Sequence, residues 1–249
     1  TGKITIIQQG GKGLHESIDN KPEFINTGIT GIYNTYQGPS LWDRNYRIEK
    51  SLLPYYNFDT TANRILFNEQ SLIESDTILL NSVENYARYH IVSLVEQLKE
   101  KGNSVPLKAI ILGCTHYPLV TDKISEILSE LKLTERYGSL IADTVHIIDP
   151  ALNTARELYR HLKERDLFNE TDSARLRSSR FFVSVPNIFE PTVKTEGDMR
   201  FNYDYQYKIR NINELKDFTM IVPLSEELIS EEQFNLIQQR LPYTYKLLN

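Results

Sequence analysis

The fold and the chemistry of this chain are decided by one stretch near its middle, Ala109-Ile110-Ile111-Leu112-Gly113-Cys114-Thr115-His116-Tyr117-Pro118-Leu119. Its apolar first part is typical of a buried parallel strand and runs directly into a glycine. A thiol, a hydroxyl and an imidazole follow in consecutive positions. Ligands of open α/β sheets bind at the carboxyl ends of the strands. The stretch therefore predicts a site at that edge of a parallel sheet.

Cys114 is the only cysteine in the chain, and it has two interpretations. A single cysteine after a strand can be a small buried hydrophobe, and a histidine near it can be structural. Packing does not require Thr115, His116, Tyr117 and Pro118 in a row after one strand, so we interpret Cys114 as catalytic. A thiol acts as a base or nucleophile when its thiolate is stabilised, and a nearby imidazole can stabilise it. His116 is the predicted partner.

Charge and composition exclude several classes of protein. The 249 residues include 28 Lys and Arg against 33 Asp and Glu, a net charge of −5 with the signs interspersed. No basic run calls for nucleic acid or an anionic membrane, and no apolar stretch approaches the ~20 residues of a membrane span. One cysteine allows no intrachain disulfide and fits a reducing compartment. We expect a cytoplasmic protein that binds neither nucleic acid nor membrane.

The spacing of apolar residues predicts alternating strands and helices. The clearest helix covers 81–101, with Asn81 as the predicted N-cap and Gly102 at the C′ position. The other expected elements are a strand over 3–8 ending in a glycine turn at 10–13, strands over 107–112, 145–148 and 180–185, a helix after the motif, a helix over 151–164 capped by Asp149, and a C-terminal helix.

This order of elements predicts an α/β fold, because strand–helix–strand units form parallel sheets. We expect a three-layer lobe with a parallel sheet over residues 1–150. A smaller α/β return segment over 151–249 would pack on this lobe or on an absent N-terminal lobe. The chain starts without methionine, two residues before an expected strand, so we expect a piece of a longer protein. The role of the irregular residues 20–70 is left open.

The run Ile111 to Leu119 resembles the second cysteine motif of the glutamate racemases, a cofactor-independent branch of the aspartate/glutamate racemase superfamily. Further similarity lies at 147–149 with 153–155, and at 180–184. Residues 65–74 are loosely similar to a family loop with a substrate-facing acid, which would be Glu74. The resemblance covers about residues 65–190 and is specific at 109–119.

The resemblance implies an isomerase that needs no PLP, metal or nucleotide. It would racemise a small dicarboxylic amino acid and so supply D-glutamate, a peptidoglycan precursor. Racemisation takes the Cα proton from one face and returns one to the other, so two opposed acid/base groups are needed. Cys114 would serve one face with His116 as its partner. Thr115 and Gly113 would bind the α-carboxylate, and Glu74 would also contact the substrate.

The chain departs from the family pattern at the second acid/base group. The family's other lobe supplies an Asp-Ser-Gly turn and a Cys-Asn-Thr motif, and neither occurs here. We therefore expect the C-terminal portion of a racemase-like protein, inactive by itself. The alternatives are a non-catalytic carboxylate-binding relative and another cysteine-dependent enzyme of the superfamily. The choice between glutamate and aspartate is open, and so is a homodimer.

The other histidines carry weaker predictions. His15 follows the glycine turn and either faces the cleft or lies on a surface loop, and it is one candidate for the opposite-face base. His146 could line the cleft edge but is not among the predicted site residues, and His90 and His161 are expected to be solvated or packed on their helices. No set of His, Cys and Asp has the spacing of metal ligands.

Overall fold

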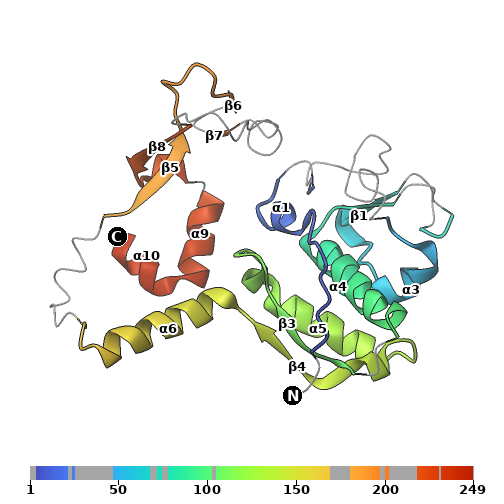
Figure 1. The fold of residues 1–249 in the computed structure, drawn as a ribbon. Helices are drawn as coiled ribbons and strands as arrows, with labels where there is room; N and C mark the ends of the chain where they lie inside the picture. Colours follow the sequence, from blue (N-terminus) through green and yellow to red (C-terminus); the bar gives the residue numbers. More distant parts are fainter. Residues whose placement is uncertain are drawn as a thin grey trace. The chain divides into compact units, whose positions relative to one another are not determined.

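The computed structural model describes residues 4–21, 24–25, 47–67, 72–74, 78–102, 105–168, 180–196, 200–201, 218–229 and 231–248. The chain divides into two compact units, Thr1–Arg165 and Asp166–Asn249. The described part is mixed α/β, with helices and small sheets (Figure 1). The division between the units falls at the end of helix α6 (Pro150–Glu164), whereas the sequence placed a boundary at its beginning.

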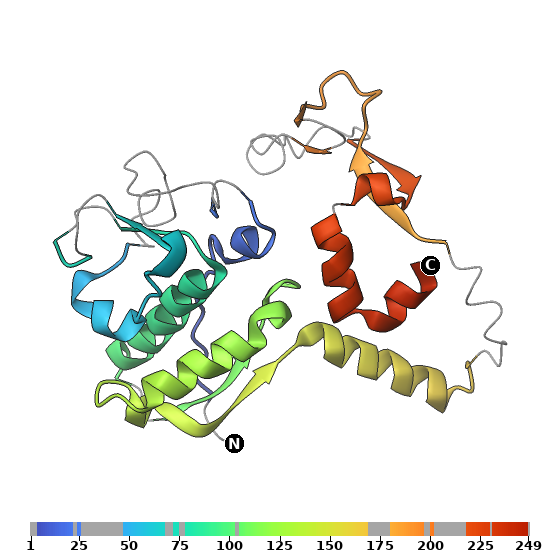
Figure 2. The same cartoon turned by 180° about the vertical axis from the view of Figure 1, so that it is seen from behind.

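Two helices form the core of the first unit, α4 (Val83–Glu100) and α5 (Thr121–Lys132). They lie side by side in both views (Figures 1 and 2). Both helices were predicted from the sequence, and α5 buries the expected stripe of Ile124, Ile127, Leu128 and Leu131. Short helices α1 (Leu14–Ile18) and α3 (Leu53–Tyr56) also pack on α4. Because neighbours surround α4, its burial extends beyond a single stripe.

The ends of α4 confirm one predicted cap and correct the other. Gly102 has φ 60°, the left-handed conformation expected of a C′ glycine. The N-cap is Ser82, whose hydroxyl accepts a hydrogen bond from the Asn85 N–H at 3.2 Å. The prediction of Asn81 was wrong, because its amide donates instead to the carbonyl of Asn63 at 2.8 Å.

The expected parallel pairing is present between β3 (Leu107–Ile111) and β4 (Ile141–Ile148). Ile110 pairs with Ile147 and Ile111 with Ile148, and the register shifts between Leu107 and Ala109. The prediction of a buried central strand was wrong, since the Ile111 side chain is 68% exposed. Full burial needs neighbouring strands and a cover on both faces, and the described sheet has two strands, with α5 packed against β4.

Helix α6 follows β4 directly and begins at the predicted cap. Asp149 accepts a hydrogen bond from the Ala151 N–H at 2.8 Å. The apolar stripe of α6 is not buried, since Leu152 is 48% exposed and Leu158 and Tyr159 are each 59% exposed. The stripe thus predicted the helix correctly, but among the described residues it is not covered.

Of the two predictions for the N-terminal segment, the strand was wrong and the glycine turn is confirmed. Residues 4–8 form no strand, although their β-branched residues predicted one. The glycine turn is present, with Gly13 at φ 84° as the N-cap of α1. Beyond it, β1 (Ile65–Phe67) and β2 (Ile78–Leu80) form an antiparallel pair that was not predicted. The remaining short elements are the 3-10 helices η2 (Lys50–Leu52), η3 (Thr61–Asn63), η4 (Tyr117–Val120) and η5 (Gly138–Leu140).

The second unit contains the predicted strand near residue 180 and the predicted C-terminal helix. Strand β5 (Phe182–Pro186) pairs antiparallel with β8 (Thr219–Pro223), and β6 (Thr195–Glu196) with β7 (Arg200–Phe201). A 3-10 helix, η6 (Glu226–Leu228), precedes α9 (Glu231–Arg240) and α10 (Pro242–Leu248). Within the described residues of both units, no helix combines the length and apolarity that crossing a membrane requires.

Candidate active site

The cysteine motif forms the turn between β3 and α5. The ladder with β4 continues as far as Leu112, whose N–H donates to the Ile148 carbonyl at 3.0 Å. The chain then leaves the sheet, and the Tyr117 N–H donates to the Cys114 carbonyl at 3.2 Å as η4 begins. Cys114 is half-buried at the carboxyl end of β3, with an exposed glycine before it and the exposed Thr115 after it. The thiol thus lies at the predicted edge of the sheet.

Cys114 and His116 are in contact. The Sγ atom lies 3.4 Å from Nδ1 of the imidazole, within reach of a hydrogen bond to sulfur. The His116 side chain is 34% exposed, so the pair is open to solvent on one side. This is the thiol–imidazole pair that the sequence predicted from a separation of two residues.

The other ring nitrogen of His116 faces a carboxylate that sequence reasoning missed. Nε2 lies 3.2 Å from Oδ1 of Asp19, the C-cap residue of α1. His15, on the same short helix, lies with its ring centroid 5.8 Å from that of His116. His15 therefore faces the motif, one of its two predicted alternatives. No local spacing could have indicated Asp19, because it comes from a distant segment of the chain.

The glycine loop before α1 contacts the motif through Tyr117. The Tyr117 hydroxyl donates to the carbonyl oxygen of Gly11 at 3.3 Å. The loop then enters α1 at its N-cap Gly13, whose N–H donates to Oε2 of Glu16 at 2.9 Å. These bonds bring the residues that follow the loop, Asp19 among them, beside the motif.

A buried histidine of α4 holds the loop from the other side. His90 Nε2 lies 2.9 Å from the Lys12 carbonyl oxygen, which can only accept, so Nε2 carries the hydrogen. Nδ1 then accepts from the Gln9 side-chain amide at 3.3 Å. Burial lowers the pKa of His90 to about 4, against a smaller opposing effect of the hydrogen bond to Lys12. His90 is therefore packed and neutral, in a structural role.

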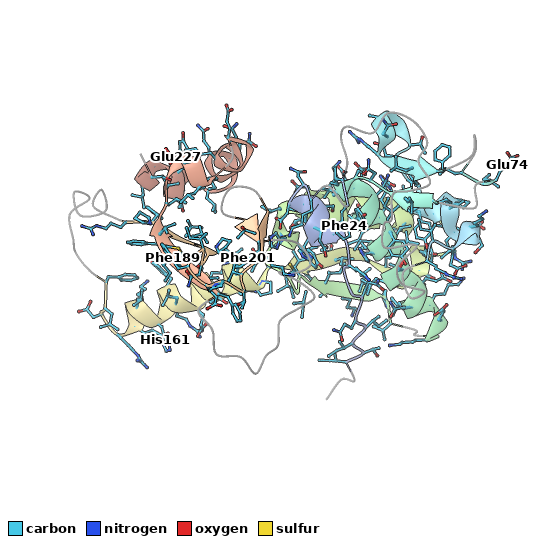
Figure 3. The ribbon with its side chains drawn as sticks, turned by 90° about the horizontal axis from the view of Figure 1, so that it is seen from above. Phe24, Glu74, His161, Phe189, Phe201 and Glu227 are labelled. Carbon is cyan, nitrogen blue, oxygen red and sulfur yellow. The ribbon has the colours of Figure 1, made fainter. Side chains whose placement is uncertain are left out.

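The other predicted site residues are spread over the first unit. Gly113 is exposed, and a Cβ there would meet no atom within 4 Å. Glu74 lies on an exposed turn at the outer edge of the unit (Figure 3), and no described contact joins it to the motif. His146 lies on β4 opposite Ala109. His161 is exposed on α6 (Figure 3).

Two further groups of charged side chains join α4 to α5 and to the turn that follows α5, rather than form a site. Arg88 of α4 donates to both oxygens of Glu130 on α5, at 2.6 and 3.0 Å. Arg136 donates to both oxygens of Glu96, at 2.6 and 3.1 Å, and the buried Tyr137 hydroxyl donates to the same carboxylate at 2.6 Å. In the part of the chain that the structure describes, no three or more His, Cys, Asp and Glu side chains form a group that could hold a metal ion.

Several curated glutamate racemases are similar to this chain. The glutamate racemase of Carboxydothermus hydrogenoformans is 29% identical over 133 residues, which are 53% of this chain and 39% of the relative. Glutamate racemase 3 of Caldanaerobacter subterraneus subsp. tengcongensis is 24% identical over 181 residues, 73% of this chain and 54% of the relative. A glutamate racemase of Clostridium perfringens is 38% identical over 77 residues, 30% of this chain and 25% of the relative.

Over part of its length, this chain is related to the glutamate racemases. The matches to these three relatives cover between 25% and 54% of the relatives' own lengths. No family model matches the chain, and no solved structure matches it. The relationship to the glutamate racemases therefore rests on these sequence similarities alone.

The described residues of this chain include a thiol–imidazole pair with a defined geometry. A thiol in contact with an imidazole can lose its proton to the ring and regain it, and an open strand end admits a ligand to the thiol. The described contacts give His116 a partner on each ring nitrogen, Cys114 on one side and Asp19 on the other. This arrangement is suited to moving a proton at one position.

Proposed function

We propose that this chain is the racemase-like portion of a cofactor-independent amino-acid racemase, with Cys114 as the acid/base on one face of the substrate Cα. The observation that carries the proposal is the 3.4 Å contact between Cys114 Sγ and His116 Nδ1 at the carboxyl end of β3. The names of the related proteins support glutamate, a small dicarboxylic amino acid, as the substrate class. The proposed architecture is the three-layer lobe of that superfamily.

The proposed proton transfer starts at the thiol. His116 takes the thiol proton on Nδ1, and the resulting thiolate of Cys114 removes the Cα proton of the bound amino acid. The electron pair left on Cα delocalises into the α-carboxylate, which gains enediolate character. The Thr115 hydroxyl and the backbone N–H groups beside it would donate hydrogen bonds to that developing charge. In the reverse direction the Cys114 thiol returns the proton to Cα.

Inversion also needs a group on the opposite face, and this chain has no second thiol. His15 is the titratable side chain from another segment, besides Asp19, that the described contacts place nearest to His116. The described contact of His15 is with the same imidazole that contacts Cys114. We therefore propose that the 249 residues exchange the Cα proton on one face and do not interconvert the enantiomers.

The test is the incorporation of deuterium at Cα in D₂O, followed by NMR, with circular dichroism recording inversion. L- and D-glutamate and L- and D-aspartate are each incubated with the wild-type chain and with Cys114→Ala. We expect exchange without inversion for one enantiomer of one amino acid, and its loss in Cys114→Ala. Absence of exchange in the folded wild-type chain contradicts Cys114 as a base in this chain, and full racemisation contradicts the one-face assignment.

The absence of a second cysteine favours one alternative, a non-catalytic relative that binds carboxylates. Such a protein keeps the anion-binding strand end without turnover. Binding of glutamate or aspartate with no deuterium incorporation would identify it. Exchange with an amino acid that is not dicarboxylic would instead favour another enzyme of the same superfamily.

A further inference from the structure

We propose that Asp19 is the positioning residue of this site, which holds His116 in the one tautomer that can accept the thiol proton of Cys114. The inference rests on the proposed function of Cys114 as a base. It extends the site to α1, a segment that no motif linked to the cysteine. It also gives a role to the hydrogen bond between Tyr117 and Gly11, which holds the glycine loop against the motif.

The Asp19 carboxylate influences which ring nitrogen of His116 carries the hydrogen. An ionised carboxylate only accepts hydrogen bonds, so the 3.2 Å contact of Asp19 Oδ1 with Nε2 favours the tautomer in which Nε2 carries the hydrogen. The lone pair of a neutral ring then lies on Nδ1, 3.4 Å from Cys114 Sγ. That nitrogen is the one that must receive the thiol proton.

The charges present after the proton transfer also favour a positioning role for Asp19. Once Nδ1 of His116 has taken the proton, the imidazolium lies between a thiolate on one side and the Asp19 carboxylate on the other. Opposite charges within about 4–6 Å stabilise one another, so Asp19 stabilises the imidazolium that the transfer creates. In the reverse tautomer Nδ1 would already carry a hydrogen and could not act as an acceptor.

A role in folding does not account for Asp19. It is the C-cap of α1, and a helix carboxyl end favours cations rather than a carboxylate. Its backbone N–H closes the helix by donating to the His15 carbonyl at 3.0 Å, a bond that any residue with an N–H can make. The Asp19 side chain is 37% exposed, and exposed ion pairs contribute little to stability. Substitutions at this position should therefore leave the chain folded.

The position of the carboxylate is set by buried groups around it. Ser17 is fully buried, and its hydroxyl donates to the Leu14 carbonyl at 2.8 Å, which fixes the turn of α1 that leads to Asp19. The hydrogen bond from the Gly13 N–H to Glu16 fixes the first turn of the same helix. The carboxylate is thus presented from a rigid element, as a positioning group requires.

The groups that face His116 come from two segments. Cys114 lies on its own segment, and α1 contributes Asp19 and His15. Glu16 acts on this set through His15, whose Nδ1 lies 2.9 Å from Glu16 Oε2. The pH dependence of the reactivity of the thiol is therefore compared between variants that differ at one of these four residues and keep the other three.

The experiment measures the rate of alkylation of Cys114 by iodoacetamide between pH 5 and 10, where incorporated label reports this thiol alone because the chain has one cysteine. Asp19→Asn is the decisive variant, because its neutral amide cannot stabilise the imidazolium and can either donate to Nε2 or accept from it, so it no longer fixes the tautomer. We expect alkylation at pH 7 to slow by about tenfold, because the opposite charge that stabilises the imidazolium is lost. Asp19→Glu should recover most of the rate.

Two controls separate positioning from general effects. Asp149→Asn removes a half-buried carboxylate at the end of the neighbouring strand β4, and it should leave the alkylation rate unchanged. The double variant His116→Ala/Asp19→Asn should react no more slowly than His116→Ala, because Asp19 acts through the imidazole. The ¹⁵N NMR signals of the His116 ring should report hydrogen on Nε2 in the wild-type chain and a mixture of the two tautomers in Asp19→Asn.

Wild-type alkylation rates and ring signals in a folded Asp19→Asn chain would overturn the inference. So would a double variant in which the two losses multiply. The proposed function fails on a different measurement, namely the absence of Cα deuterium exchange in the wild-type chain. An Asp19-dependent thiol without such exchange would leave the positioning role standing and remove the racemase-like chemistry.

Discussion

The Tyr117 hydroxyl lies 3.3 Å from the carbonyl oxygen of Gly11, and this contact joins the cysteine motif to the glycine loop. A Cβ on residue 11 would lie 2.0 Å from that hydroxyl oxygen and 2.7 Å from the ring carbon that bears it. The backbone angle of Gly11 does not itself demand glycine, since its φ is not positive. The close approach of the tyrosine does.

Gly11→Ala should therefore push Tyr117 away and destabilise the first unit by about 1–3 kcal/mol, as overpacking commonly does. Urea unfolding followed by circular dichroism measures the loss. Gly113→Ala is the matched control, because its Cβ would meet no atom within 4 Å, and it should change stability by less than about 0.5 kcal/mol. Equal effects of the two substitutions would show that the contact does not constrain the loop.

The stability of the chain should fall as pH decreases through the range in which His90 titrates. Burial lowers the pKa of His90 from 6.5 to about 4, so the unfolded chain binds a proton more readily than the folded chain. The stabilisation is complete above about pH 6.5 and is lost as pH falls toward 4, by up to roughly 3 kcal/mol. Urea unfolding at several pH values between 7 and 4 gives this slope.

His90→Gln separates this effect from the titration of carboxylates. Glutamine keeps an amide donor for the Lys12 carbonyl and does not titrate. The free energy of unfolding of the variant should change less with pH between 6.5 and 4.5 than that of the wild-type chain. Parallel pH profiles would mean that His90 is not held neutral in the folded state.

Arg88→Ala should cost about 2–3 kcal/mol of stability. The Arg88 guanidinium is 8% exposed and lies between Glu84 on its own helix and Glu130 on α5. Its removal leaves two carboxylates without this partner, although the 43% exposure of Glu130 makes the loss smaller than for a fully buried pair. Chemical unfolding of the variant at pH 7 tests the value. Lys123→Ala, which removes an exposed partner of Glu84, should cost at most about 0.5 kcal/mol.

The effect of Arg88→Ala on stability should also depend on pH. Hydrogen bonds from Arg88 hold the pKa of Glu130 below its usual range. The stabilisation is therefore present above the pKa of the unfolded chain and is lost as pH falls through the lowered pKa of the folded chain. The stability difference between wild type and Arg88→Ala should shrink at low pH. A difference that stays constant would argue against the charge of Glu130 as its source.

Glutamate or aspartate at millimolar concentration should raise the melting temperature of the chain. A ligand at a hundredfold excess over its Kd stabilises a folded protein by about 2.7 kcal/mol. Thr115→Val should reduce this shift because it removes the hydroxyl proposed to bind the α-carboxylate. Thr154→Val, on the exposed helix α6, is the control and should respond like the wild-type chain. No shift with either amino acid in a folded chain would contradict a carboxylate site.

The sequence by itself determined those features that depend on neighbouring residues. The helices at 83–100, 121–132 and 150–164 follow from apolar spacing and from caps such as Asp149, which act within a few positions. The Cys114–His116 contact belongs to the same class, because two residues on one turn after a strand cannot lie far apart. The parallel pairing of β3 and β4 followed from the helix between them.

Only the tertiary structure decided which distant segments meet the motif. Asp19, Gly11 and His90 come from α1, the glycine loop and α4, and their approach depends on burial and on hydrogen bonds between residues far apart in the chain. Residues 4–8 and β3 show that a local pattern also fails to predict whether a strand is paired or buried. The β-branched residues at 4–8 predicted a strand, and the apolar run at 107–112 predicted a buried strand. Pairing and burial, however, require partners that no local pattern specifies.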